Sequence, residues 1–172
     1  MTRQMSSFRL GTSLFGIDVL VVREINRSLD LTEVSPAPPF VRGLVNLRGQ
    51  IVTIVDPSIR LGMPRREISA ESACIVLKSR GETDRMSSEG LVVEAMPKDT
   101  VGLLVDGIGD MVPVESPAIE RAPANVGGVE AEFVTGIVTL QQEILILLDL
   151  KKVLAIGPDG SWDTETSKGE TK

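Results

Sequence analysis

An internal repeat limits the folds open to this chain more than any other feature of its sequence. The segment FVRGLVNLRGQIVTIVD, residues 40–56, aligns without gaps on FVTGIVTLQQEILILLD, residues 133–149. A weaker similarity joins residues 15–25 to residues 101–111. The matching positions are Phe40/Phe133, Val41/Val134, Gly43/Gly136, Val45/Val138, Leu47/Leu140, Ile51/Ile144 and Asp56/Asp149, with Gly16/Gly102 and Val19/Val105 upstream. Because the repeat is much longer than a solenoid period, it predicts two pseudo-equivalent subdomains.

Both copies run in the same order: a strand-rich opening, a connector with proline, a pair of strands joined near a glycine, and a short helical turn. We expect one domain over residues 6–156, with subdomain 1 over about 6–62 and subdomain 2 over about 91–156. Neither half is large enough to bury its apolar strands alone. The two halves should therefore share one hydrophobic interface.

Short, β-branched apolar runs dominate the chain, and glycine and proline separate them. Many short strands between turn signals predict an all-β sandwich or barrel. Near-continuous apolar runs such as ILILL imply strands that are covered on both faces or lie at a shared core. The expected strands cover residues 15–25, 44–47, 51–55, 73–77, 91–93, 101–105, 137–140 and 144–148.

Three stretches lack this pattern. Residues 78–89 (KSRGETDRMSSE) are polar and without periodicity, which predicts a long exposed loop. The connector 115–132 contains two prolines and a Gly127-Gly128 pair at which we expect a bend or loop. Residues 157–172 have Trp162 as their one large apolar side chain, and we expect a disordered tail.

Composition excludes several classes of function. The chain has no histidine, which excludes Ser–His triads and His-ligated zinc. Its net charge of -6, its 3% of aromatic residues and its lack of tyrosine argue against a nucleic-acid binder. The apolar runs are far shorter than the ~20 residues that cross a bilayer, and the first residues lack a secretory signal. We expect a soluble, intracellular chain without membrane insertion.

No catalytic constellation is visible, and we predict that the chain is not an enzyme and holds no cofactor or metal. Cys74 lies in the apolar run ACIVL, where a cysteine is usually a small buried hydrophobe, and no histidine is present to activate it. Asp106 and Asp110 lack the ligand spacing of a calcium loop and are better explained as turn residues.

The remaining signal points to recognition. Arg48 lies in the Asn46-Leu47-Arg48-Gly49 link between two apolar runs, where a hairpin turn should expose it. A solvated turn residue or an internal carboxylate partner is the more common fate of a single arginine. The second copy has Thr-Leu-Gln-Gln at this place, so the architecture does not require Arg48, which favours a functional role. Glu24, at the end of the run VLVVREI, has the same two interpretations.

The glycine and the aspartate that recur in the repeat are explained first by structural roles. We expect Gly43 and Gly136 to provide a backbone bend, and Asp56 and Asp149 to serve as caps or turn residues. A partner could still depend on the bend.

These residues lie in segments that resemble the chemotaxis coupling proteins, the CheW family. The combination of FGIDV-x-x-VREI with FVRG-x-x-NLRG carries the resemblance. The matching segments are residues 8–25, 37–62, 100–114 and 133–154. The resemblance implies two intertwined, five-stranded SH3-like β-barrels around a common core, with few short helical turns.

The same resemblance implies a non-enzymatic scaffold, cytoplasmic and located at receptor arrays. Such adaptors couple the cytoplasmic tips of methyl-accepting chemotaxis receptors to the regulatory domain of the histidine kinase CheA. The glutamate of VREI, the glycine of FV-x-G and the arginine of NLRG correspond here to Glu24, Gly43 and Arg48. Val22 and, in the second copy, Ile108 complete the expected partner-binding set.

Two other functions stay open. An adaptor of a non-flagellar pathway, such as pilus motility or second-messenger control, would have the same sequence features. A small-molecule-binding β-barrel would instead require a concave polar pocket with perturbed carboxylates.

Overall fold

The computed structural model describes residues 2–155 of the chain. The polypeptide forms two five-stranded sheets and a small two-stranded one, so the all-β prediction is confirmed. The strands are β1 (Thr2–Leu10), β2 (Ser13–Asp18), β3 (Val22–Asn26), β4 (Val41–Leu47), β5 (Gln50–Val55), β6 (Ala73–Leu77), β7 (Val101–Val105), β8 (Gly107–Glu115), β9 (Asn125–Val126), β10 (Val129–Glu130), β11 (Val134–Thr139) and β12 (Ile144–Leu148). The helices are α1 (Pro57–Arg60), α2 (Arg80–Ser88) and α3 (Leu150–Val153), with 3-10 turns η1 (Val19–Val21), η2 (Ser116–Ala118) and η3 (Ala131–Phe133).

The two large sheets have the same topology. The first barrel has the strand order β3-β6-β7-β5-β4, and the second barrel has the order β8-β1-β2-β12-β11. In each barrel a hairpin joins an antiparallel pair, β4–β5 or β11–β12, and its second strand runs parallel to β7 or β2. Gly102 pairs with Ile54 in the first barrel and Gly16 with Leu147 in the second. The weak upstream similarity of the sequence therefore reflects a real structural equivalence.

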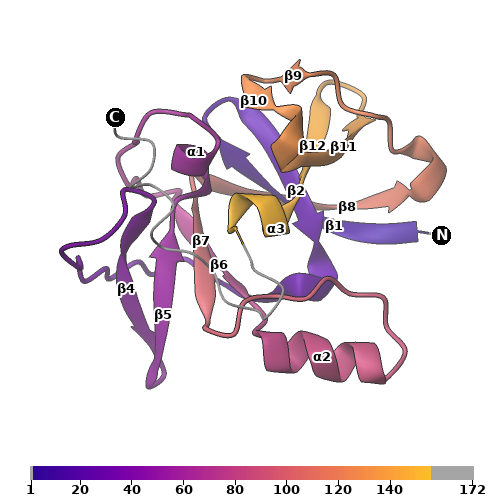
Figure 1. Cartoon of the computed structure of the whole chain (residues 1–172). Helices are drawn as coiled ribbons and strands as arrows, with labels where there is room; N and C mark the ends of the chain where they lie inside the picture. The colour runs from indigo at the N-terminus through magenta and orange to yellow at the C-terminus, as the bar shows by residue number, and fades with distance from the viewer. Residues whose placement is uncertain (1, 156–172) are drawn as a thin grey trace.

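Each barrel takes strands from both halves of the chain. Strands β1 and β2 pair with the C-terminal strands β8 and β12, whereas β7, from the C-terminal half, lies between β6 and β5 of the first barrel. The sequence segments 6–62 and 91–156 thus each contribute to both barrels. Figure 1 shows the two barrels with α3 between them in this view.

A shared hydrophobic core joins the barrels, as the repeat predicted. Alternate side chains of a strand serve different cores: Ile75 faces the shared core and Cys74 faces the interior of the first barrel. Ile146 and Leu145 do the same in the second barrel. This two-sided burial explains the unbroken apolar runs of the sequence. Helix α3 closes the shared core with Leu150 and Val153.

The structural roles expected for the repeated glycines and aspartates are confirmed. A β-bulge lies in each hairpin at the same place, between Val41 and Gly43 and between Val134 and Gly136. Asp56 caps α1 by accepting the N–H of Ser58, and Asp149 caps α3 by accepting the N–H of Lys152.

Several local predictions were wrong. Residues 78–89 do not form a loop, because Arg80–Ser88 form the helix α2. Its first turn is fixed by Glu82, whose carboxylate accepts the N–H of Ser79 at 3.1 Å. The run 15–25 is not one strand, because η1 separates β2 from β3, and residues 91–93 form no strand.

Neither β1 nor the outer strand β8 appeared among the expected strands. The Gly127-Gly128 bend is confirmed, since both residues have positive φ and join β9 to β10. The expected disorder of residues 157–172 concerns a segment outside the described residues.

Candidate functional site

Arg48 occupies the exposed tip of the β4–β5 hairpin, as predicted. Its side chain is 76% exposed, and Arg48 and Gly49 form a two-residue turn with φ values of 52° and 86°. Positive φ at both positions is the requirement of a type I′ hairpin turn, which favours asparagine or glycine. The Asn46 side chain stabilises the turn by accepting the N–H of Gly49 at 2.9 Å. The hairpin therefore holds an arginine where its backbone is disfavoured.

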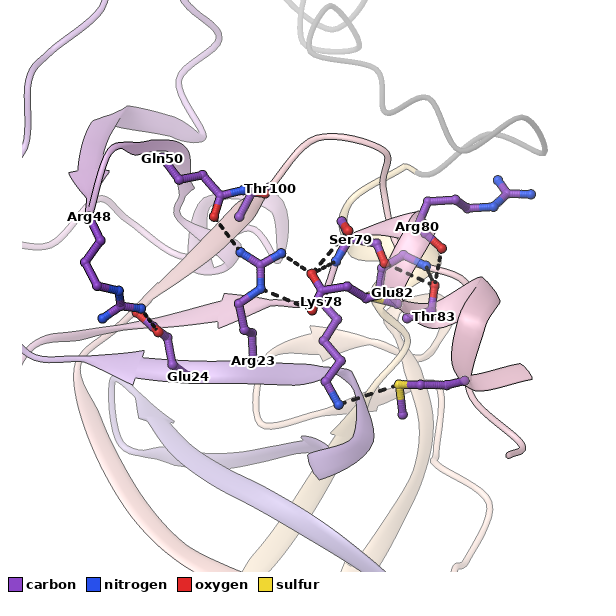
Figure 2. A network of polar contacts seen from close by, with 12 residues as sticks. Arg23, Glu24, Arg48, Gln50, Lys78, Ser79, Arg80, Glu82, Thr83 and Thr100 are labelled. Atoms are coloured by element: carbon purple, nitrogen blue, oxygen red, sulfur yellow. Dashed lines mark hydrogen bonds and ion pairs between the residues drawn. The ribbon is translucent and has the colours of Figure 1, made fainter. Parts of the chain in front are cut away.

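Glu24, on the outer strand β3, is the direct partner of Arg48. The guanidinium donates to the Glu24 carboxylate across the surface of the first barrel (Figure 2). Because the Glu24 side chain is only 26% exposed, the pair has one half-buried and one solvated member. The sequence analysis named both residues, and the structure brings them together.

A second ion pair, adjacent in sequence, anchors α2 to the same surface. Arg23 donates to both carboxylate oxygens of Glu82 and, through Nη1, to the side-chain oxygen of Gln50 at 2.9 Å. Gln50 in turn donates to the Thr100 hydroxyl at 2.9 Å (Figure 2). The start of β5, the outer strand β3 and the N-terminal turn of α2 are thereby held together.

This anchoring changes the ionisation of Glu82. Burial would raise the pKa of its carboxyl, but hydrogen bonds from Arg23 and from the N–H of Ser79 outweigh burial and lower the pKa. The composition of residues 78–89 suggested a loop, and the capping pattern Ser79-x-x-Glu82 was the sequence signal that was missed.

Gly43 lies in β4, away from the hairpin tip, and its role is one of close packing. It has φ +149°, and a Cβ built there would lie 2.5 Å from the carbonyl oxygen of Thr32. That approach lets Thr32 and Leu44 exchange two backbone hydrogen bonds of 2.8 Å. The glycine thus fixes the connector before β4 against the hairpin.

Val22 and Ile108 occupy corresponding places in the two barrels. Val22 begins β3, Ile108 is the second residue of β8, and both side chains are half-buried against the shared core. Val22 lies on the same strand as Glu24, whereas Ile108 belongs to the other barrel. The five predicted residues therefore do not form one cluster.

The buried thiol of Cys74 is unreactive. The residue is 2% exposed in the interior of the first barrel, and burial, together with the charge of Glu24, raises the pKa of the thiol to about 12. A thiol with this pKa stays protonated at neutral pH and is a poor nucleophile. In the part of the chain that the structure describes, no group of three Cys, Asp or Glu residues is arranged to hold a metal ion.

The surface around Arg48 is therefore suited to recognition. It presents a solvated guanidinium, a half-buried carboxylate and a rigid set of backbone positions, and such groups bind carboxylates or carbonyls of another protein. Arg23, Gln50 and Glu82 belong to the same surface. The repeat gave no signal for them, because Glu82 lies outside it, and the second copy has Gly109 and Glu143 where the first has Arg23 and Gln50.

Comparisons with known proteins agree with this architecture. The family model described as the CheW-like domain matches residues 4–156. The chain is 30% identical over 148 residues to the chemotaxis protein CheW of Klebsiella aerogenes, covering 86% of this chain and 79% of that protein. It is 30% identical over 151 residues to the chemotaxis protein CheW of Rhizobium meliloti, covering 88% and 86% of the two chains.

A solved structure gives the same result. The crystal structure of the scaffolding protein TtCheW from Thermoanaerobacter tengcongensis superposes with a TM-score of 0.72 at 25% identity, covering 94% of this chain and 92% of that one. The two barrels are SH3-like, as in that neighbour. Sequence and structure together show that the chain belongs to the CheW-like family.

Proposed function

We propose that this protein is a non-enzymatic adaptor that couples methyl-accepting chemotaxis receptors to the histidine kinase CheA. The observation that carries the proposal is the exposed Arg48, held at a turn whose backbone disfavours arginine and bonded to Glu24. A fold does not need this arrangement, because the equivalent turn of the second barrel has Gln141, Gln142 and Glu143 instead. Family membership supports the same conclusion.

The proposed mechanism is coupling without chemistry. A helical receptor tip contacts the first barrel, and Arg48 exchanges its internal carboxylate for an acceptor on the receptor. The kinase regulatory domain, at the receptor arrays on the cytoplasmic side, binds other barrel surfaces. Glu24 lies with Arg48 on the surface that contacts the receptor, and Val22 and Ile108 lie in or near the contacts with one of the two partners. Signal transfer requires that the adaptor fits one receptor state better than the other, since equal affinity would shift nothing.

Gly43 supports this function indirectly. Because a Cβ at this position would lie 2.5 Å from the Thr32 carbonyl oxygen, a side chain here would move the connector before β4. A loss of partner binding in a Gly43 variant would then follow from a displaced surface.

None of the helices among residues 2–155 is long and apolar enough to cross a membrane. An adaptor of a non-flagellar pathway has the same geometry, and the kinase that binds would distinguish the two.

Co-sedimentation tests the proposal. The purified chain is mixed with a receptor signalling fragment and the cognate kinase, and incorporation and autophosphorylation are measured in the same samples. We expect incorporation and kinase activation by the wild type and a loss of both with Arg48→Glu. Arg9→Glu is the matched control, because Arg9 is an exposed arginine paired with Glu143 near the corresponding turn of the second barrel. A wild-type protein that binds neither partner would overturn the proposal.

A further inference from the structure

The buried ion pair of the first barrel has no counterpart in the second. Arg42 is the bulged residue of β4, its side chain is 7% exposed, and its Nη1 donates to Asp56 at 2.9 Å and to the Arg66 carbonyl at 3.3 Å. The first barrel thus buries a guanidinium beside the aspartate that caps α1. The position beside the capping aspartate of this barrel is therefore one that accepts an arginine side chain.

In the second barrel the position of Arg42 is taken by Thr135. Thr135 is the bulged residue of β11, and its hydroxyl donates to the Leu147 carbonyl at 3.3 Å. Asp149, the equivalent of Asp56, caps α3 but has no ion-pair partner among residues 2–155. The cation is missing while its capping aspartate is retained.

A pocket of about 340 Å³ lies beside Thr135 in the second barrel. Its apolar wall includes Met5, Ile17 and Leu147, and its polar groups are Thr135, Asp18, Glu94 and Arg3. This volume is at the lower end of the range for small ligand pockets and holds one long side chain.

One wall of the pocket belongs to an insertion. The β1–β2 turn of the second barrel consists of Gly11 and Thr12, whereas the corresponding β6–β7 connection of the first barrel spans residues 78–100. Val92 and Glu94 of this connection line the pocket of the other barrel, and Val92 is 74% exposed at the surface. Met96, fully buried in the shared core, holds the segment in place.

One carboxylate at the pocket has no direct partner among residues 2–155. Glu94 makes no hydrogen bond or ion pair with any described residue, whereas Arg3 lies 3.8 Å from Asp18. Burial raises the pKa of Glu94, and Asp149 and Asp18 raise it further; Lys151 and Arg3 act in the opposite direction without reversing the shift. A half-buried carboxylate in this situation gains from an added cation.

We infer that this pocket binds an arginine side chain presented by a protein partner. The apolar wall would cover the aliphatic stem, and the Glu94 carboxylate at the pocket wall would receive the guanidinium, as the Asp56 carboxylate receives Arg42 in the first barrel. Arginine is favoured over lysine because its planar fork can bond both oxygens of one carboxylate at once. The site lies in the second barrel, whereas Arg48 and Glu24 lie in the first.

Titration of the full chain with two peptides tests this inference. The probes are acetyl-Gly-Arg-Gly-amide and its citrulline analogue, which has the same shape without the charge, and the readout is the backbone amide resonances of Glu94 and Thr135. We expect saturable shifts with the arginine peptide and at least about tenfold weaker binding of the citrulline peptide. Equal binding of the two peptides, or no saturable shift with either, would overturn the inference.

Variants sharpen the test. Glu94→Gln should weaken the arginine peptide about tenfold, and Glu89→Gln, an exposed glutamate of the same insertion that does not line the pocket, should not. Thr135→Arg should fill the pocket from within and abolish peptide binding. Unchanged binding to Glu94→Gln contradicts the inference. Neither receptor nor kinase takes part, so a failure here is distinct from a failure of the adaptor function.

Discussion

The two barrels share their strand order, their bulged hairpin and their capping aspartate, but they differ in three places. The first barrel has Arg42 at the bulge, Arg48 at the hairpin tip and an insertion over residues 78–100. The second has Thr135, a Gln-Gln-Glu turn and the short turn Gly11-Thr12. The shared features are those the architecture requires. The differences mark positions that are free to carry recognition.

The largest difference in stability between the barrels should come from the two capping aspartates. Asp56 caps α1 and compensates buried Arg42, whereas Asp149 only caps α3. We expect Asp56→Ala to cost about 3–5 kcal/mol, because it leaves a buried charge unpaired, and Asp149→Ala to cost about 1 kcal/mol. Urea unfolding of both variants measures the two values. Equal losses would mean that the Arg42 pair does not distinguish the barrels.

The two bulge glycines should differ by a smaller amount. A methyl group at Gly43 would meet the Thr32 backbone at 2.5 Å with φ +149°. At Gly136 it would meet the side-chain Cγ2 of Ile119 at 2.5 Å and the backbone oxygen of Glu120 only at 3.0 Å. A side chain can move more easily than a hydrogen-bonded backbone. We expect a cost of about 2–3 kcal/mol for Gly43→Ala and about 1–2 kcal/mol for Gly136→Ala. Thermal unfolding of both variants measures the two losses of stability. A larger loss for Gly136→Ala than for Gly43→Ala would contradict this prediction.

The smallest effect should appear in α2, which is present only in the insertion of the first barrel. The pKa of Glu82 is lowered in the folded chain, so its contribution to stability is present above its ordinary value of 4.5 and is lost as the pH falls through the lowered value. For a partly exposed pair this contribution is about 1 kcal/mol or less.

Hydrogen exchange, corrected for intrinsic rates, should therefore show α2 opening below pH 4.5 before the barrels do. In Glu82→Gln the helix should already be more open at neutral pH and should lose this pH dependence. Protection in α2 that is independent of pH in the wild type would exclude the Arg23–Glu82 pair as its anchor.

The parts of this structure that the sequence predicted are those that depend on local signals. The hairpin at Arg48, the caps at Asp56 and Asp149, and the burial of Cys74 each follow from a few neighbouring residues and were confirmed. The repeat predicted two equivalent units with a common core, because matched apolar positions must be buried in matched places.

The parts that the sequence did not predict depend on distant pairing. Strand β8 contains Pro113 and several exposed residues, and it is ordered by pairing with β1 at the edge of its sheet. The position of β7 between β6 and β5 of the first barrel could not be predicted from neighbouring residues either. Helix α2 has no apolar stripe, and its capping by Glu82 and the contact with Arg23 determine its position. The candidate site was found in part, since Arg48 and Glu24 were named but Arg23 and Gln50 were not.

The most direct test of the account separates recognition from stability at Arg48. Arg48→Gly removes the guanidinium and also relieves the φ of 52°, so the thermal midpoint should equal or slightly exceed that of the wild type. The affinity for a receptor signalling fragment should fall about 5–30-fold, while Arg9→Gly in the second barrel should leave it unchanged. Unchanged affinity in Arg48→Gly would contradict the assignment of the first barrel surface as the recognition site.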